Sequence, residues 1–560
     1  MAALRDAARH PAATAVPLLR EHEHDHDEEH PQLEETKPQL QARLRLYWLA
    51  TVLCCGALLF GYDSGLIGGV LTFQSFHTDF RFGDYGIPSE TTVSAIAVGS
   101  QQVGALVGCL AIWPVNNYQG RRMAIGVCAA VFCVGVVLEL IPTLSWFYLG
   151  RFIAGLGVGG SSSVIPIYLS EMAPKDLRGQ LGSCYQFMFT IGIFVSYWID
   201  YAVGQMASGS AQWQIPIALQ LVPGALMGLG VMTLHESVRW LSARGEHDRA
   251  RRSLEWIRAD NKSFAVVDEL AEISTAIDDE LREKSGLTVR ELFCEWPNTH
   301  RILLAVGIFL AQQSTGATAL AYFGPQFFAL IVGPGSKTLL LTGIFGFIKV
   351  ASCGAFILFL SDRFGRKVLL FVGAAVMAVF MFVTAALVRS ITGMDYGNTT
   401  TTSSSSSSST TNSPEPSTTT TTTATGIITV ALIYLSIIFF NLSWGPLPWP
   451  YTSEIFPTRI RESGVTCGVA AQWTFNLVWS SATPFLLVKL GWATFALFGV
   501  LDVAVMVFVV LCLKETARKT LEQINALFED VAAAPAAAVD QQREDGTRRR
   551  LLGDYSREDE

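Results

Sequence analysis

Twelve long apolar stretches dominate the middle of this chain, and each is close to the length that a helix needs to cross a bilayer. Helices on the surface of a soluble core would carry polar side chains every third or fourth residue. Stretches 93–113 and 215–234 instead contain no charged residue. We therefore predict an all-α membrane protein with twelve transmembrane helices. The predicted spans are 47–70, 93–113, 124–142, 146–169, 182–203, 215–234, 302–325, 338–360, 368–388, 426–449, 464–486 and 491–513.

The charge distribution supports the same fold class. Charged residues make up 16% of the chain, against about 25% in typical soluble proteins, and the mean hydropathy is +0.36. Residues 1–44 and 514–560 carry −4 and −3 of the net charge of −8, so the segment between them is nearly neutral. A nucleic-acid-binding protein and a soluble enzyme of ordinary composition are therefore excluded.

Lysine and arginine gather in alternate connections between the spans, which predicts the orientation in the membrane. One set of connections contains Arg121, Arg122 and the basic segment 235–300, and the other set is nearly free of basic residues. We predict a multi-pass plasma-membrane protein with the basic side and both termini in the cytoplasm. The predicted organisation is an N-tail (1–44), an N-terminal six-helix half (45–234), a helical linker (235–300), a C-terminal six-helix half (301–513) and a C-tail (514–560).

Two polar segments are expected to lie outside the folded body. Asn398 begins an acceptor sequence for N-glycosylation and opens a Ser/Thr-rich loop, 391–424, on the predicted outer side. The His-rich tract 21–30 alternates with acidic residues, which is typical of a solvated tail. We predict no metal site and no cofactor.

The charged residues after the even-numbered spans repeat between the two halves. Gly120–Arg121–Arg122 follows the second span, and Gly365–Arg366–Lys367 follows the eighth. Two similar halves can rock around a site at the middle of the membrane, and salt bridges at the cytoplasmic ends can hold one state closed. The residues predicted for these gate salt bridges are Arg121, Arg122, Glu171, Arg178, Glu236, Arg239, Asp362, Arg366, Glu454 and Arg461.

Several motifs occur in order along the chain and carry a family resemblance. They are FGYDSG (60–65), GRR (120–122), RFIAGLG (151–157), ESVRWL (236–241), QQSTG (312–316), DRFGR (362–366), WGP (444–446) and EIFP (454–457). With these motifs the chain resembles the sugar porter family of the major facilitator superfamily over about residues 45–525, and fungal members most closely. The resemblance implies a carrier that works by alternating access. The chain departs from the family pattern at Asn117 and Thr318, where an acid and an amide are expected.

Amide and aromatic side chains inside the spans suit a substrate that is rich in hydroxyl groups. Gln472 and Asn476 lie four residues apart and so share one helix face. The alternative for these amides is hydrogen bonding between helices. By resemblance, the residues that match sugar contacts are Gln186, Gln312, Gln313, Trp449 and Gln472, with Tyr322 and Phe60 as weaker matches and Thr318 at the position of a usual amide.

Charged residues inside the spans are the other candidates. A bare carboxylate in mid-membrane costs about 2.5–3.5 kcal/mol, so Asp63 needs an opposite charge or a proton. Arg151 is the expected partner, and the resemblance implies that this pair couples transport to protons. A static pair in a facilitative carrier is the alternative. Glu139 is expected to reach water near the outer end of its span, and Lys349 either pairs with Asp502 or binds an anionic substrate.

The sequence therefore predicts a monomeric secondary transporter, and not an enzyme, that imports a hexose, pentose or related sugar together with protons. An organic-acid symporter is one alternative, because Lys349 lies in a span and because 197–201 resembles the quinate-permease branch of the same family. A facilitative sugar carrier and a non-transporting nutrient receptor are the others. The expected partners are the solute, protons and the lipid bilayer, with no nucleic acid.

Overall fold

The computed structural model describes residues 37–82, 88–174, 178–259, 264–284, 294–360, 363–400, 424–457 and 459–517, together with 524 and 528. Helices make up nearly all of these ranges, and no strand occurs within them. The His-rich tract, Asp362 and most of the Ser/Thr-rich loop lie outside the described residues, as do the side chains of Arg178 and Asn398.

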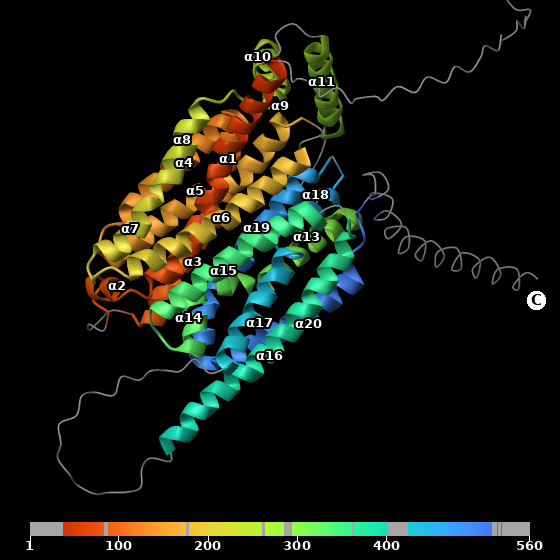
Figure 1. The fold of residues 1–560 in the computed structure, drawn as a ribbon. Coiled ribbons are helices and arrows are strands. Elements are labelled where there is room, and N and C mark those ends of the chain that lie inside the picture. The colour runs from red at the N-terminus through yellow and green to blue at the C-terminus, as the bar shows by residue number, and fades with distance from the viewer. Residues whose placement is uncertain are drawn as a thin grey trace, which may run out of the picture.

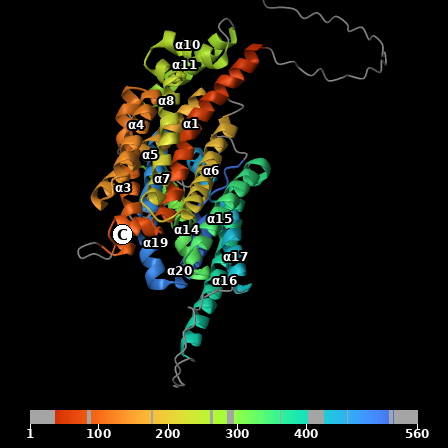
Figure 2. The same cartoon turned by 60° about the vertical axis from the view of Figure 1, so that its left-hand side comes forward.

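The first half of the bundle consists of six long helical segments, coloured red to yellow in Figure 1. They are α1 (Lys37–Val70), α3 (Glu90–Tyr118), α4 (Arg121–Glu139), α5 (Leu144–Met172), α6 (Arg178–Gly204) and the pair α7 (Ala211–Leu219) and α8 (Leu221–Met232). A short helix, α2 (Gln74–Asp79), follows α1 at one end of the bundle. At the opposite end lie α9 (Val238–Ala243), α10 (His247–Arg258) and α11 (Phe264–Lys284) (Figures 1 and 2).

The second half, coloured green to blue, lies beside the first (Figure 1). Its helices are α13 (Trp296–Ser314), α14 (Ala317–Val332), α15 (Ser336–Ala355) with the π-helix η1 (Phe356–Leu360), α16 (Arg366–Thr400), α17 (Ala424–Asn441), α18 (Pro448–Glu454), α19 (Arg461–Leu490) and α20 (Ala493–Cys512). Two of its spans are broken. Gly316, at φ 78°, separates α13 from α14, and residues 442–447, which lead into a Pro-rich stretch, separate α17 from α18.

The described residues contain 11 helices that are long and apolar enough to cross a membrane, where α7 and α8, α13 and α14, and α15 and η1 each count as one. The remaining predicted span is α19, a 30-residue helix in the same bundle. Gln472, Asn476 and several hydroxyl side chains lower its hydropathy. The least apolar span is thus one of those predicted to bind substrate.

Glycines allow the helices of the first half to pack unusually closely. A Cβ atom on Gly155 of α5 would lie 2.2 Å from the carbonyl oxygen of Gln101 on α3, and one on Gly159 would lie 2.0 Å from that of Ala105. Larger residues at these positions would force α3 and α5 apart. This close approach brings α3 within reach of Arg151 on α5.

The two halves meet where α3 packs against α19, α6 against α15 and α1 against α14. Within the described residues, most hydrogen bonds between the halves involve α14, and one more joins Thr190 of α6 to Cys353 of α15. Tyr197 donates to the carbonyl of Ala321, Gln326 to the carbonyl of Gly68, and Tyr322 contacts α1 and α3. Because α14 comes after the break at Gly316, these contacts close the interface toward the end of the bundle that carries α2, which is the outer side in the predicted orientation (Figure 1).

A larger residue at Gly68 should prevent this closure. Its Cβ atom would lie 2.3 Å from the carbonyl oxygen of Tyr322, and overpacking of this kind costs about 1–3 kcal/mol. We expect G68V to lower the population of the closed outer interface about tenfold. The distance between spin labels at Gln74 and Lys337, two exposed positions at this end of the bundle, measures the change. G182V is the control, because no atom lies within 4 Å of a Cβ there. An unchanged distance in G68V would contradict the expectation.

Candidate functional site

A fully buried ion pair lies between α1 and α5. The Arg151 Nη1 atom is 2.5 Å from Asp63 Oδ1, and both side chains are 0% exposed. Arg151 also donates to the carbonyl of Ala97, at 3.2 Å, and to the side-chain oxygen of Gln101. The guanidinium therefore ties α1 and α3 to α5, and a charge in this position is held by three separate acceptors.

Glu139 is a second carboxylate at the same guanidinium, and our expectation that it reaches water was wrong. It is buried, and its Oε2 atom lies 3.9 Å from Arg151 Nη1. The reason is the close packing of α4 on α5: a Cβ atom on Gly150 would lie 2.7 Å from the backbone nitrogen of Glu139. The last turn of α4 consequently faces α5 rather than the solvent. Asp63, Gln101, Glu139 and Arg151 form what we call the buried ion cluster.

A group of buried amides lies on α13 and α19, which pack against each other. Gln312 donates to the carbonyl oxygen of Trp444, at 2.8 Å, in the break between α17 and α18. The side-chain oxygens of Gln312, Gln472 and Asn476 are buried and accept no hydrogen bond within the described residues. Thr318 donates to the side-chain oxygen of Gln313 at 2.6 Å. These amides thus keep free acceptors in the interior, and hydroxyl donors can fill them.

The aromatic candidates lie near the same interface between the halves. Phe60 on α1 packs against Trp473 on α19, with ring centroids 5.2 Å apart. Trp449 begins α18 and meets Phe309 of α13 edge to face. Gln186 on α6 is half-buried. Together with Gln313, these side chains come from both halves, and Phe60 contacts the second half through Trp473.

Tyr322 differs from the other candidates because its hydroxyl group is already engaged on both sides. It accepts a hydrogen bond from Gln102 at 2.7 Å and lies 3.4 Å from the hydroxyl of Ser64. The side chain is 2% exposed.

The other charged residues in the spans do not pair with each other. Lys349 on α15 is buried next to the ring of Phe345, with its Nζ atom 6.0 Å from the ring centroid. Asp502 on α20 is buried, and neither of its oxygens accepts a hydrogen bond within the described residues. No ion pair between the two is present there, so the expected Lys349–Asp502 pair is not formed.

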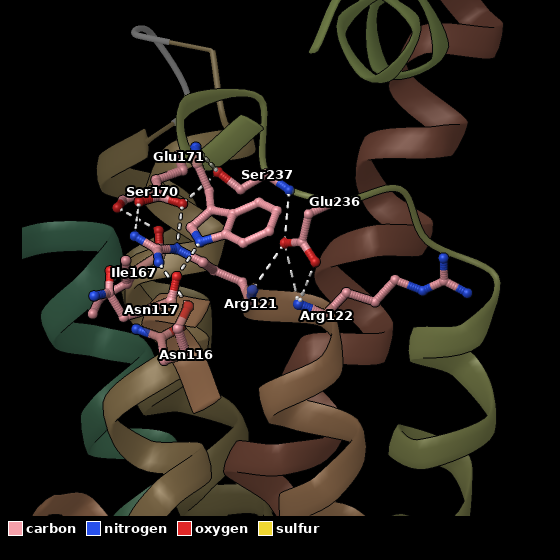
Figure 3. Close-up of polar contacts among 10 residues, drawn as sticks. Asn116, Asn117, Arg121, Arg122, Ile167, Ser170, Glu171, Glu236 and Ser237 are labelled. Atoms are coloured by element: carbon pink, nitrogen blue, oxygen red, sulfur yellow. Dashed lines mark hydrogen bonds and ion pairs between the residues drawn. The ribbon is translucent and has the colours of Figure 1, made fainter. Parts of the chain in front are cut away.

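Arg121 and Glu171 form a two-point ion pair at the end of the first half that carries α9, which is the cytoplasmic end in the predicted orientation (Figure 3). Arg121 Nε and Nη2 lie 3.0 and 2.9 Å from the two oxygens of Glu171, and the side chains are only 13% and 8% exposed. Ser237 donates a third hydrogen bond, of 2.5 Å, to the same carboxylate. The first residue of α4, the last turn of α5 and the start of α9 are joined in this way.

Glu236 caps the start of α4 beside this pair (Figure 3). Its carboxylate accepts from the backbone N–H groups of Arg121, at 2.9 Å, of Arg122 and of Ser237. A carboxylate in this position is favourable because it meets unpaired N–H groups at the positive end of the helix dipole. Burial raises the pKa of Glu236, and the three N–H groups partly offset that shift. Gly120 provides the space for this carboxylate, because a Cβ atom at position 120 would lie 2.4 Å from it.

The second half repeats this arrangement. Arg366 lies 3.2 Å from Glu454, and Glu515 accepts from the backbone N–H groups of Arg366 and Lys367 at 2.8 and 3.0 Å. Thr516 donates to Glu454 at 2.7 Å, as Ser237 does to Glu171. We did not predict Ser237, Glu515 and Thr516 as members, although the repeated segments 235–239 and 514–518 carry the signal.

The remaining gate candidates make other contacts. Arg122 donates to the carbonyl oxygens of Val231 and Met232 at the end of α8. Arg461 donates to the carbonyl oxygen of Phe456 at 3.3 Å, and Arg239 is exposed.

The chain is similar to known transporters over most of its length. Residues 49–528 match the family model described as sugar (and other) transporter. The quinate permease of Emericella nidulans is 33% identical over 498 residues, which cover 87% of this chain and 89% of that protein. A probable quinate permease of Aspergillus terreus is also 33% identical and covers 90% and 91%. The structure of the proton:xylose symporter XylE bound to 6-bromo-6-deoxy-D-glucose has 26% identity and a TM-score of 0.68, and covers 87% of this chain and 99% of that one.

The ion pair between Arg121 and Glu171 gives a test of the cytoplasmic cluster. R121E leaves two carboxylates facing each other in a mostly buried site, so we expect a loss of about 3–5 kcal/mol in the free energy of unfolding. The double variant R121E/E171R restores opposite charges and should recover at least half of the lost free energy of unfolding. Thermal unfolding in detergent measures both variants. R249E breaks an exposed pair, 59% and 35% exposed, and should cost less than about 1 kcal/mol. A double variant no more stable than R121E would refute the pairing.

Proposed function

Since this chain belongs to the sugar transporter family, we propose that it is a plasma-membrane symporter that imports a sugar or a related polyhydroxylated solute together with protons. The observation that carries the proposal is the buried ion pair of Asp63 and Arg151 beside a set of interior amides with free acceptors. Charges are expensive within a bilayer and mark proton or substrate pathways when they occur there. The transporter is a monomer with cytoplasmic termini, and its outer loop carries a glycan on Asn398.

The proton is bound by the ion cluster. Asp63 and Glu139 both approach Arg151, so the cluster carries one negative charge in excess when both carboxylates are ionised. Binding of one proton removes this excess, because one guanidinium then faces one carboxylate. A proton on Asp63 also weakens its bond to Arg151, which frees α1 to move relative to α5. Glu139 keeps the guanidinium partnered during that step.

The solute is held by the amides of α13 and α19. The free oxygens of Gln312, Gln472 and Asn476 accept hydrogen bonds from its hydroxyl groups, and Gln186 and Gln313 complete the site. The rings of Phe60 and Trp449 offer apolar faces to the carbon skeleton. The site lies between the halves, so rocking of one half against the other exposes it to each side in turn. The repeated cytoplasmic clusters keep each half rigid while this happens.

Replacement of Asp63 tests proton coupling. We expect wild-type uptake of labelled glucose or xylose at about pH 5 to fall about tenfold or more when an uncoupler removes the proton gradient. D63N should lose this sensitivity while it still exchanges labelled for unlabelled solute, because the asparagine cannot take up a proton. D502N is the matched control, since Asp502 is equally buried but does not face Arg151. If the uncoupler does not change uptake by the wild type, the symport proposal is wrong and the protein is a facilitative carrier.

A second candidate function is symport of an organic acid. The curated relatives named above are quinate permeases, and quinate is a polyhydroxylated ring with one carboxylate. Lys349 is buried, and no carboxylate in the described part of the chain forms an ion pair with it. It lies one turn from Cys353 on α15, and Thr190 of α6 packs against Cys353, one turn from Gln186. A substrate carboxylate is therefore a fitting partner for this lysine.

The methyl ester of quinate distinguishes the two candidates because it keeps the ring hydroxyl groups and lacks the charge. If the protein carries an organic acid, the wild type should prefer quinate to the ester. K349M should take up quinate about 30-fold less well than the wild type, because loss of a buried ion pair costs about 2–5 kcal/mol. Uptake of the ester should not change. K337M, at the exposed start of the same helix, is the control. Wild-type quinate uptake in K349M would exclude Lys349 as the anion site.

A further inference from the structure

Two pairs of neighbouring residues connect the buried ion cluster to the contact between the halves. Asp63 and Ser64 are consecutive on α1, and Gln101 and Gln102 are consecutive on α3. The first member of each pair binds Arg151. The second member of each pair contacts the hydroxyl group of Tyr322, which belongs to the other half.

All members of this arrangement are buried. Asp63, Gln102 and Arg151 are 0% exposed and Ser64 is 3% exposed. Tyr322 accepts from Gln102 at 2.7 Å and reaches Ser64 at 3.4 Å. Its hydroxyl group thus spans the gap between α1 and α3, and the width of the same gap is set by the two bonds that Arg151 makes one residue away.

Tyr322 lies on the helix that closes the outer side. It occupies the second turn of α14, and the next residue, Phe323, has non-helical backbone angles of φ −121° and ψ 27°. Because breaks lie on both sides of Tyr322, at Gly316 and at Phe323, the segment that carries it can move without moving α13. The hydrogen bonds of Tyr322 to Ser64 and Gln102 can therefore control whether α14 stays packed against α1.

We infer that Tyr322 couples the protonation state of the ion cluster to the opening of the outer gate, which rests on the proposed role of Asp63 and Arg151 in proton binding. With Asp63 ionised, Arg151 holds α1 and α3 at the spacing that lets Ser64 and Gln102 both bind Tyr322, and α14 stays closed. A proton on Asp63 relaxes that spacing, so Tyr322 loses one partner and α14 is released.

The ionisable groups around this link come from each of the neighbouring helices. Asp63 on α1, Glu139 on α4 and Arg151 on α5 face one another. On α6, Tyr197 lies near Tyr322, and Asp200 packs against Gly69 one and a half turns beyond Asp63. The residue of α3 that touches Tyr322 is neutral. Asp63 is therefore the acid that both binds Arg151 and directly precedes Ser64, one of the two partners of Tyr322.

Tyr197 provides a matched control within the same gate. It also makes a hydrogen bond to α14, at 2.6 Å to the carbonyl of Ala321, and it is also buried. Its helix, α6, holds no residue that bonds to Arg151 in the described part of the chain. Y197F and Y322F thus each remove one hydroxyl group from the contact between α14 and the first half, and only Y322F removes the connection to the ion cluster.

The experiment follows the outer gate in the purified full-length protein, with spin labels at Gln74 and Lys337 and with the exposed Cys184 and Cys294 replaced by serine. In the wild type, the fraction of open gate should rise between about pH 7.5 and about pH 5. Y322F should reduce this pH-driven change about 5-fold or more, the size of a typical coupling between two sites. In D63N, the fraction of open gate should be the same at both pH values and should equal that of the wild type at low pH.

Y197F should change the open fraction at every pH but keep its pH dependence. The inference is overturned if the wild-type gate does not respond to pH, if Y322F responds like the wild type, or if Y197F loses the response to the same extent. The measurement needs no substrate, so it is separate from the uptake test. Uptake that ignores the uncoupler would refute symport even where the gate responds to pH through Tyr322.

Discussion

The positive charge of Arg151 in the middle of the first half is the constraint on which much of the molecule depends. A buried guanidinium must have partners, because removal of one partner from a buried pair costs about 3–5 kcal/mol. Asp63, Gln101 and the carbonyl of Ala97 supply hydrogen bonds, and Glu139 lies 3.9 Å away. Since these residues come from α1, α3 and α4, one side chain on α5 sets the relative positions of four helices.

The backbone packing makes that arrangement possible. Glycines at 155 and 159 bring α3 against α5, and Gly150 does the same for α4. Without them the partner groups would lie a side-chain width further from Arg151. The cytoplasmic ends are held differently, by carboxylates that cap helix starts and pair with Arg121 and Arg366. Small residues therefore determine the geometry in the lipid-spanning part, and charged hydrogen bonds determine it where water is near.

The sequence was sufficient to predict the fold because hydrophobic length and charge asymmetry are properties of single segments. Pairwise geometry was less accessible. Because Glu139 lies near the end of a span, we expected it to reach water. Its burial, however, depends on which direction the last turn of the helix faces, and the position along the span does not determine that direction. The double engagement of Tyr322 joins residues more than 200 positions apart, so no local pattern predicts it. Ser237 and Thr516 were accessible in principle, because they occupy equivalent places in the repeat.

The repeat also shows how the two halves differ. Both halves have the cytoplasmic cluster in nearly the same form, with Glu236 matched by Glu515 and Ser237 by Thr516. Within the described residues, only the first half has an ion cluster in its interior, whereas the free amide acceptors of Gln312, Gln472 and Asn476 belong to the second. In the proposed solute site the first half contributes only Phe60 and Gln186, so a proton on the ion cluster affects the solute mainly through the contact between the halves. Most hydrogen bonds of that contact involve α14, so coupling between the two ligands passes through this helix and through the packing around it.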